Sequence, residues 1–322
     1  MNALALYQAK ELPHIEESLR RHISDLHPLV RPTALHVLEA GGKRLRPLLT
    51  ILTARALGHA GNGVYPLASS LELLHCATLL HDDILDSASV RRGRPAAHTV
   101  YGGSHTILAG DALLALANSL VAAYGQPELT QCLSKAILST VTGEIQEIAH
   151  VRDVDLNLEG YLDIITGKTA CLIQSACQAG ALLARAPKTL EEAAAGYGMN
   201  LGVAFQLVDD ALDYTSSQDV SGKPKGADIR EGKLTLPLIF YIESLSLADR
   251  TRFTKAFRDN LLTEEEIASA VLGVASGGHA QRTREMASSY LERARECLTH
   301  FPAAQETELL FAALAGMAAR DK

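Results

Sequence analysis

The sequence predicts an all-α protein, and three observations support this prediction. Apolar residues recur at three- and four-residue spacing over long segments, which is the period of a helix that buries one face. Ala and Leu, two of the strongest helix formers, are abundant, and the strict alternation typical of strands is scarce. Clusters of Gly and Pro separate the periodic segments, as expected where helices end.

The helical pattern is strongest in four segments of 20 or more residues: Leu67–Asp86, Thr130–His150, Leu158–Ala184 and Leu190–Tyr214. The breaks fall at Gly41-Gly42, Gly61-Asn62-Gly63, Arg92-Gly93-Arg94-Pro95, Gly102-Gly103, Ala186-Pro187 and Ser221-Gly222-Lys223-Pro224. No Pro/Ser-rich linker or low-complexity tract divides the chain. We therefore expect a single domain over residues 1–322.

Composition excludes several classes of protein. Apolar residues make up 47% of the chain, so it can build a sizeable core and disorder is not expected. A net charge of −7 argues against nucleic acid as the main partner. The cysteines form no metal-like pair and are odd in number, which is typical of reduced thiols in a cytoplasmic protein. They are Cys76, Cys132, Cys171, Cys177 and Cys297.

The sequence favours neither a signal peptide nor a transmembrane helix. The start, Met1-Asn2-Ala3-Leu4, lacks the basic region of a signal peptide. The most apolar long window, 107–124, is interrupted by Asp111 and Asn118. An Asp near the centre of a bilayer costs about 2.5–3.5 kcal/mol on insertion scales. We expect this window to be a buried core helix and the chain to have no transmembrane segment.

The most informative feature is an Asp-Asp-x-x-Asp pattern that occurs twice, at Asp82-Asp83-Ile84-Leu85-Asp86 and at Asp209-Asp210-Ala211-Leu212-Asp213. Residues four apart share a helix face, so the first and last Asp of each motif project together and repel each other. Burial in an apolar stretch makes this repulsion more costly. Carboxylates without a Cys or His cluster suit a hard ion such as Mg²⁺, which also binds substrate phosphates. The repeat predicts two helices that face each other across a cavity with cations between them.

Basic residues cluster near both motifs. The segment Gly41-Gly42-Lys43-Arg44-Leu45-Arg46-Pro47 could bind a phosphate group, although alone it could equally be a basic surface turn. Arg91-Arg92-Gly93-Arg94 follows the first motif closely, and guanidinium groups match phosphate oxygens in bidentate geometry. Further lysines, namely Lys168, Lys223, Lys225 and Lys233, come before and after the second motif. Together they predict a polyphosphate ligand that is neutralised by metals and by cationic side chains.

Two polar residues share the faces of the acidic motifs. His75 lies two helical turns before Asp82, and Gln206 lies three residues before Asp209. No Walker A motif is present, which disfavours a P-loop nucleotide enzyme. The apolar residues beneath the motifs, namely Leu74, Ala77, Ala112 and Ala115, include no acid, base or nucleophile and would suit a hydrocarbon. A diphosphate that is both anchor and leaving group, polarised by metal ions, fits these parts.

These motifs resemble those of the trans-isoprenyl diphosphate synthases, and the match covers nearly the whole chain. The pieces GGKRLRP, LLHCATLLHDDILDSASVRRGRP, AGDALLA, GKTA, FQLVDDALDY and GKPKGADIREGKLTLPL occur in family order. The resemblance implies a homodimer of all-α subunits, the isoprenoid synthase fold, with long helices around a deep central cavity. It also implies head-to-tail condensation of isopentenyl diphosphate with an allylic diphosphate, with three Mg²⁺ ions per active site.

The resemblance also implies residue roles. Asp82, Asp86 and Asp209 would bind the metals, with Asp83, Asp210 and Asp213 supporting them through water. The residues expected to hold the allylic diphosphate are Arg91, Lys168, Thr169, Gln206, Lys223 and Lys233. Those expected to hold isopentenyl diphosphate are Lys43, Arg46, His75 and Arg92. The six aspartates, Arg91 and Lys168 would carry catalysis, and the released diphosphate can accept the proton.

Product length would be set by side chains below the first motif. Short-chain members of the family carry Tyr or Phe five positions upstream of the motif, where this chain has Ala77, followed by Thr78. Ala77 and Thr78 leave the path open, and Leu74 and Ala115 are the other positions expected to influence chain length. We expect a product of about seven to nine isoprene units for a quinone side chain, because no bulky side chain blocks the path at these positions. Geranylgeranyl diphosphate is the alternative, with Leu71, Leu74 and Leu116 as stops.

Two other functions remain open. A non-catalytic subunit of a heteromeric synthase is usually marked by loss of one acidic motif, and both motifs are intact here. A terpene cyclase shares the all-α fold, but its second motif differs, and it would not need the two arginine-rich clusters for a second diphosphate. The acidic motifs and the basic clusters together favour the synthase.

Overall fold

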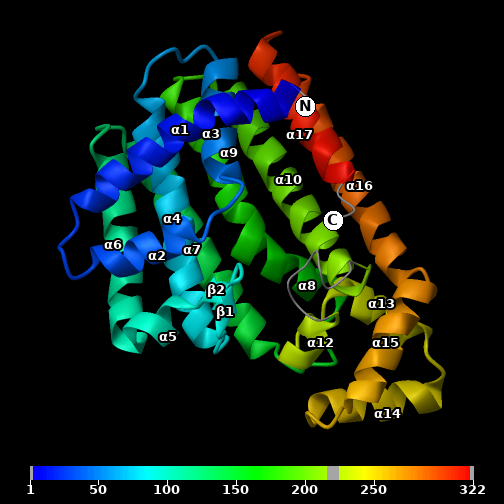
Figure 1. The fold of residues 1–322 in the computed structure, drawn as a ribbon. Coiled ribbons are helices and arrows are strands. Elements are labelled where there is room, and N and C mark those ends of the chain that lie inside the picture. Colours follow the sequence, from blue (N-terminus) through cyan, green and yellow to red (C-terminus); the bar gives the residue numbers. More distant parts are fainter. Residues whose placement is uncertain (1–2, 216–224, 320–322) are drawn as a thin grey trace. The chain divides into compact units, whose positions relative to one another are not determined.

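The protein is all-α, as predicted (Figure 1). The computed structural model describes residues 3–215 and 225–319. The chain forms two compact units, which are described separately. Unit 1 comprises Met1–Leu138, Leu172–Gly198 and Cys297–Ala313, and unit 2 comprises Ser139–Cys171, Met199–Glu296 and Leu314–Lys322. A single domain over the whole chain remains a prediction.

Unit 1 contains most of the N-terminal helices. They are α1 (Ala3–Ser24), α2 (Arg31–Glu39), α3 (Leu45–Ala56), α4 (Val64–Leu85), α5 (Ala97–Tyr101), α6 (Gly103–Ala122) and nearly all of α9 (Cys171–Leu183). Between α4 and α5, the strands β1 (Val90–Arg91) and β2 (Arg94–Pro95) form a short antiparallel hairpin. Its two turn residues, Arg92 and Gly93, have φ of 51° and 75°, which the primed hairpin turns require. The hairpin keeps the arginine-rich segment close to the end of α4.

Helices α4 and α6 make the most extensive contact in unit 1, and they run antiparallel (Figure 1). At one end the backbone N–H of Leu67 donates to the Tyr124 hydroxyl over 3.0 Å. At the other end Nε2 of His81 lies 3.2 Å from the carbonyl oxygen of Ile107. A Cβ atom on Gly110 would lie 2.3 Å from Nε2 of His81, so this crossing requires glycine. His81 therefore packs between the helices, in agreement with its expected structural role.

Unit 2 contains the remaining helices. They are α8 (Leu158–Ile165), the π-helix η1 (Thr166–Ala170), α12 (Ala227–Glu231), α13 (Leu236–Ser244), α14 (Leu247–Arg258), α15 (Glu264–Ser276) and most of α16 (His279–Leu298). The boundaries between the units fall inside α16 and inside α7 (Pro127–Ala149), α10 (Lys188–Thr215) and α17 (Gln305–Ala318).

The four predicted long helices are confirmed, with one refinement. Three of them correspond to α4, α7 and α10, with ends within three residues of those predicted. The fourth, Leu158–Ala184, is divided into α8, η1 and α9. At η1 the backbone packs closely against α7, because a Cβ on Gly143 would lie 2.2 Å from the backbone nitrogen of Lys168. A π-helical turn inside an α-helix frequently marks a functional site.

One expectation about burial was wrong. Helix α6 is long and apolar enough to cross a membrane by length and composition, and it is the one such helix among the described residues. Only 33% of its apolar window is buried, whereas a core helix was predicted. One face packs on α4, and the opposite face exposes Ile107 and Leu108. The periodicity predicted the helix correctly, but it could not show that one face lacks a covering element within the single chain.

The cysteines agree with the prediction for reduced thiols. All five are free; four are buried and Cys297 is partly exposed. Burial raises the pKa of Cys76 and Cys177 to about 12, so both are protonated and unreactive at neutral pH.

Candidate active site

The first acidic motif forms the C-terminal end of α4, and its three aspartates differ in exposure. Asp82 is partly exposed and Asp86 is exposed, whereas Asp83 is buried. The Asp83 carboxylate accepts hydrogen bonds from Arg91, at 2.7 Å from Nε and 2.5 Å from Nη2. Asp83 was expected to support a metal through water, and Arg91 to hold a diphosphate. In the structure these two side chains bind each other and attach the hairpin to α4.

Cationic side chains converge on His75. Burial, followed by the guanidinium groups of Arg46, Arg92 and Arg91, holds the pKa of His75 well below its usual value. His75 is therefore neutral and can donate or accept a hydrogen bond without adding charge. The structure thus brings together three of the four residues expected at the isopentenyl diphosphate site. The fourth, Lys43, is exposed on the adjoining loop, and its carbonyl accepts a hydrogen bond from Gln8 over 2.7 Å.

Arg44 organises this loop, a role that the sequence did not reveal. It is 4% exposed and has φ of 47°, a left-handed conformation at the N-cap of α3. Its guanidinium donates to Glu16 at 2.7 Å, to Glu72 at 2.9 Å and to the carbonyl of Leu38 at 2.8 Å. Arg44 is therefore held inside the protein, and its neighbours in the basic segment occupy the loop surface. Repeated arginines in the sequence give no indication of which one is buried.

The same loop contacts the hairpin. Nη1 of Arg92 donates a hydrogen bond to the carbonyl of Gly41. A Cβ on Gly42 would lie 2.8 Å from that Nη1 atom, so a side chain there would displace Arg92. The paired glycines here allow close approach of an arginine.

The second acidic motif lies on α10 within unit 2, and its middle aspartate is again the buried one. Asp209 is exposed, Asp213 is partly exposed and Asp210 is 5% exposed. Asp210 accepts hydrogen bonds from the Tyr161 hydroxyl at 2.5 Å and from the Gln206 amide at 2.7 Å. The amide oxygen of Gln206 in turn accepts from Thr169 at 2.9 Å. Two predicted diphosphate ligands, Thr169 and Gln206, are therefore connected through one hydrogen-bond chain to the motif.

Burial raises the pKa of Asp210 to about 7, and the neighbouring Asp209 charge adds to this effect, while the bonds from Tyr161 and Gln206 oppose it. A fourth carboxylate also lies near the motif. This carboxylate is Asp228, whose backbone nitrogen donates a hydrogen bond to Asp213 over 3.3 Å. Burial, followed by the charges of Asp213 and Asp210, raises the pKa of Asp228 well above its usual value. Asp228 was part of the family pattern in the sequence, but no role was predicted for it.

The lysines of unit 2 form a compact ionic cluster. Nζ of Lys168 lies 2.5 Å from Glu147 and 2.9 Å from Glu144, and Nζ of Lys233 lies 3.5 Å from Glu147 and 2.8 Å from Glu231. The structure therefore brings together two of the predicted allylic diphosphate ligands. Lys223, the third lysine of this prediction, lies outside the described residues. No sequence pattern singled out Glu144 and Glu147, because acids on a partly exposed helix usually face water.

The predicted chain-length positions are distributed over α4 and α6. Leu74 and Ala77 are each 2% exposed, and Thr78 is partly exposed. Ala115 is exposed on α6, so the single chain gives it no buried tunnel wall to line, contrary to expectation. Further along α4 from the motif, a group of mainly apolar side chains in unit 1 packs so closely that the space between them cannot hold a water molecule. They are Leu67, Leu71, Val121, Leu129, Cys132, Leu133, Ser175 and Ala179.

Comparison with known proteins agrees with these features. Residues 27–273 match the model of the polyprenyl synthetase family. The chain belongs to the polyprenyl synthetase family. It is 32% identical over 310 residues to heptaprenyl diphosphate synthase component 2 of Geobacillus stearothermophilus, covering 96% of each chain. It is 34% identical to octaprenyl diphosphate synthase of Escherichia coli, covering 72% of each chain.

Solved structures of family members have the same fold. A polyprenyl synthase from Caulobacter crescentus, complexed with calcium and isoprenyl diphosphate, is 34% identical with a TM-score of 0.94, covering 99% of this chain and 97% of that one. Other matches are named for decaprenyl, geranylfarnesyl and geranylgeranyl products. This polyprenyl synthetase is therefore a trans-prenyl diphosphate synthase, a prenyltransferase of isoprenoid biosynthesis that acts on isoprenyl diphosphates.

The family uses divalent metal ions, and the first and last aspartates of each acidic motif are of a type that suits such ions. Among residues 3–215 and 225–319, no group of three His, Cys, Asp or Glu side chains could hold a metal by itself. Mg²⁺ commonly binds through one or two carboxylates, with waters and substrate phosphates completing its coordination. Asp82 is partly exposed and Asp86 and Asp209 are exposed, which fits a mode in which the ion arrives with the diphosphate.

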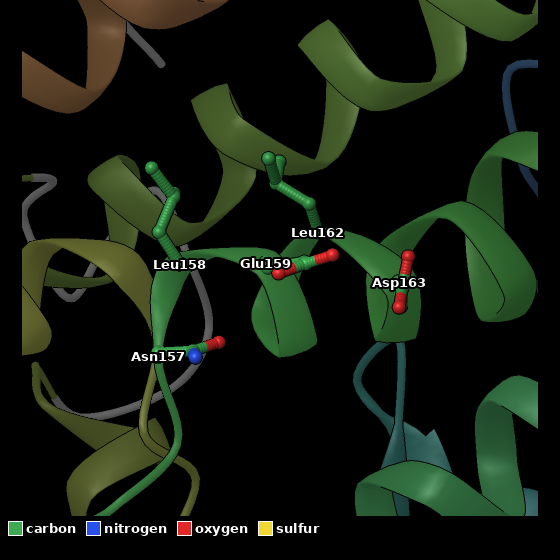
Figure 2. A pocket seen from close by; sticks show the side chains of 5 residues that line it. All are labelled: Asn157, Leu158, Glu159, Leu162 and Asp163. Atoms are coloured by element: carbon green, nitrogen blue, oxygen red, sulfur yellow. The ribbon is translucent and has the colours of Figure 1, made fainter.

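A separate hollow lies beside α8 and contains none of the predicted site residues. It is lined by Asn157, Leu158, Glu159, Leu162 and Asp163 (Figure 2). Figure 2 shows Leu158 and Leu162 projecting to the same side of the helix. Asn157 caps α8 by accepting a hydrogen bond from the backbone of Gly160 over 2.9 Å, so its role there is structural.

Proposed function

We propose that this polyprenyl synthetase condenses isopentenyl diphosphate with an allylic diphosphate to make an all-trans product of about seven to nine isoprene units, as long-chain members of the fold do. The observation that carries this proposal is the arrangement of charge within each unit. In unit 1, Arg46, Arg92 and neutral His75 gather near the first acidic motif. In unit 2, Lys168 and Lys233 gather on one carboxylate near the second. Two separate cationic groups suit two diphosphate substrates.

The first group is proposed to hold isopentenyl diphosphate through Lys43, Arg46, His75 and Arg92. The second is proposed to hold the allylic diphosphate through Lys168, Thr169, Gln206 and Lys233, together with Arg91 and Lys223. Arg91 contributes indirectly in this scheme, since its contact with Asp83 positions the hairpin that carries Arg92. The Thr169–Gln206–Asp210 chain keeps the Gln206 amide in one orientation.

Three Mg²⁺ ions are proposed, bound by Asp82, Asp86 and Asp209. When bound, they act as Lewis acids that stabilise the departing allylic diphosphate. The protein residues hold both substrates by their diphosphates and keep the hydrocarbon chains in an apolar environment. Near the predicted hydrocarbon path Leu74, Ala77 and Leu71 carry no acid or base. The released diphosphate is therefore proposed to accept the proton lost as the new double bond forms.

The proposed product length depends on the absence of bulky side chains just below the first motif on α4. Ala77 and Thr78 put no aromatic ring below the first motif. Leu71 lies eleven residues before Asp82, about 16 Å along a helix that rises 1.5 Å per residue. A product of seven to nine units requires the hydrocarbon path to continue past Leu71, which is a stop in the geranylgeranyl alternative. The names of the heptaprenyl, octaprenyl and decaprenyl relatives support a long product.

The direct test uses the purified chain with labelled isopentenyl diphosphate and, in turn, dimethylallyl, geranyl, farnesyl and geranylgeranyl diphosphates. The dephosphorylated products are separated by reversed-phase chromatography. Products of about thirty-five to forty-five carbons, the seven to nine five-carbon units argued from the open path, would support the proposal. A product that stops at twenty carbons would favour the geranylgeranyl alternative, with Leu71 and Leu74 as stops.

A cytoplasmic homodimer is proposed as the working form. Helix α7 supports this, because four large apolar side chains recur along one of its faces and are half or more exposed in the single chain. They are Leu138, Val141, Ile145 and Ile148. On α6, Ile107 and Leu108 are likewise exposed. Contiguous exposed apolar surface of this kind commonly marks a protein interface.

A second candidate is one component of a two-chain synthase. The relatives named component 2, from Geobacillus stearothermophilus and Bacillus subtilis, favour this possibility. Both acidic motifs are intact in the present chain, so it would be the component that carries catalysis. Activity of the purified chain by itself would decide for the homodimer. Inactivity that is relieved by a cell extract from the source organism would decide for the two-chain enzyme.

A further inference from the structure

One carboxylate oxygen in unit 2 contacts both lysines that are proposed to bind the allylic diphosphate. Oε2 of Glu147 lies 2.5 Å from Nζ of Lys168 and 3.5 Å from Nζ of Lys233. Glu147 lies on α7 and Lys168 on η1. Lys233 lies in the segment after α12. The two ammonium groups therefore meet on a single anion that is supplied by α7.

This cluster is shielded from water. The side chains of Glu147, Lys168 and Lys233 are 20%, 22% and 18% exposed, respectively. Ion pairs that are partly buried are screened less than surface pairs, so their charges influence a ligand more strongly. Glu144, only 12% exposed, adds a second carboxylate 2.9 Å from Lys168, and Glu231 lies 2.8 Å from Lys233. The two lysines are thus surrounded by three carboxylates, and the cluster carries a net negative charge.

We propose that Glu147 is an internal competitor for the allylic diphosphate site, occupying the position on Lys168 and Lys233 that the diphosphate takes when it binds. The inference rests on the proposed function of these lysines. A diphosphate that engages both ammonium groups must weaken their contacts with Glu147 and lie close to its charge. Glu147 therefore lowers the affinity for every ligand of this subsite, including the elongated product and inorganic diphosphate. In an enzyme that repeats its reaction, this competition favours release.

The competition makes an unusual prediction, namely that removing a charged group from the site strengthens binding. Glu147→Gln keeps the size of the side chain and an oxygen acceptor but removes the negative charge. We expect the dissociation constant of a non-reactive allylic thiodiphosphate, measured by calorimetry in Mg²⁺, to fall about tenfold, which corresponds to about 1.4 kcal/mol. The inhibition constant of inorganic diphosphate should fall similarly. The KM for isopentenyl diphosphate should not change, because its proposed ligands belong to unit 1.

Two further variants complete the test. Glu144→Gln removes a carboxylate that contacts Lys168, and it should strengthen analogue binding less than Glu147→Gln. Glu292→Gln, on the exposed face of α16, should leave binding unchanged. Structural damage would weaken binding, so tighter binding by the Glu147 variant distinguishes competition from a role in folding. Unchanged or weaker analogue binding by Glu147→Gln would overturn the inference. If the wild-type enzyme itself neither bound the analogue nor elongated any primer, the proposed function would fail as well.

Discussion

At the scale of single residues, burial divides the three aspartates of each motif into two kinds. The middle residue, Asp83 or Asp210, is buried and binds protein side chains. The outer residues Asp82, Asp86, Asp209 and Asp213 are partly or fully exposed. The Asp-Asp-x-x-Asp spacing therefore combines two solvent-accessible carboxylates, the proposed metal ligands among them, with one internal anchor.

The outer aspartates are expected to be essential for turnover. Asp82→Asn or Asp209→Asn removes a charge that is proposed to bind metal, and kcat should fall by at least about 10²–10³-fold, the range for loss of one group that stabilises transition-state charge. Steady-state rates in Mg²⁺ would measure the loss, and circular dichroism would confirm that the variants stay helical. Near-normal turnover by either variant would contradict the three-metal proposal.

The pKa of Asp210, raised to about 7, predicts how stability depends on pH. Its folded-state pKa lies above the unfolded value of about 3.9, so the folded state binds more protons between these limits. The free energy of unfolding without metal should therefore decrease as the pH rises from about 4 to about 7. In Asp210→Asn this decrease should be smaller. Urea unfolding at several pH values, with a chelator present, would check it, and equal slopes for both proteins would contradict the shifted pKa.

The two substrates should be separable by mutation, because their proposed ligands lie in different units. Arg46→Ala should mainly raise the KM for isopentenyl diphosphate, and Lys168→Ala should mainly raise the KM for the allylic primer. Loss of one charged hydrogen bond corresponds to a change of roughly tenfold or more. Initial rates with each substrate varied in turn would show the split. Equal effects of both variants on both substrates would refute the assignment.

At the scale of elements, α4 connects substrate binding with product length. It carries the first acidic motif at its C-terminal end, His75 near its middle, and Leu71 and Leu67 one and two turns before His75. The buried position of Ala77 between these sites makes it the place where a larger side chain would act. The π-helix η1 has a comparable role in unit 2, since it carries Lys168 and Thr169.

Ala77→Tyr is expected to shorten the product. An aromatic ring at this buried position would obstruct the proposed hydrocarbon path, and the overpacking would cost about 1–3 kcal/mol of stability. The first condensation should proceed at a nearly normal rate, and chromatography should show mainly products of about fifteen to twenty carbons, as a ring that blocks the path would dictate. Ala115→Tyr is the comparison, because Ala115 is exposed on α6. If Ala115→Tyr shortened the product and Ala77→Tyr did not, the limit would lie on α6, where only a covering chain could bury it.

At the scale of the whole molecule, the apolar stripe on α7 is the feature that the single chain leaves unexplained. Leu138 is 68% exposed and Ile145 is 61% exposed, although both are residues that folding normally buries. Their helical spacing places them on one face, as expected for a surface that packs against another helix. Association with a second copy would bury this stripe.

The double substitution Val141→Glu and Ile145→Glu should therefore weaken the proposed homodimer. Each Glu would desolvate a charge in an apolar interface, but both positions are exposed in the single chain, so the fold should persist. Light scattering after size-exclusion chromatography would report the change from dimer to monomer. A wild-type protein that is monomeric, or a double variant that stays dimeric, would contradict the assignment of this surface.

The sequence alone predicted the fold class, the ends of three long helices, the acidic motifs and the class of reaction. These features depend on local patterns: three- and four-residue apolar spacing for α4, α7 and α10, and motif spacing for the aspartates.

The tertiary structure decided which members of each cluster are buried and what they contact. Arg44 is held inside by Glu16 and Glu72, whereas Lys43, its neighbour in the chain, is exposed. Glu147 joins Lys168 and Lys233, and Ala115 is exposed on α6 in the single chain. Such pairings depend on side chains brought together from distant segments, and local periodicity carries no information about that approach.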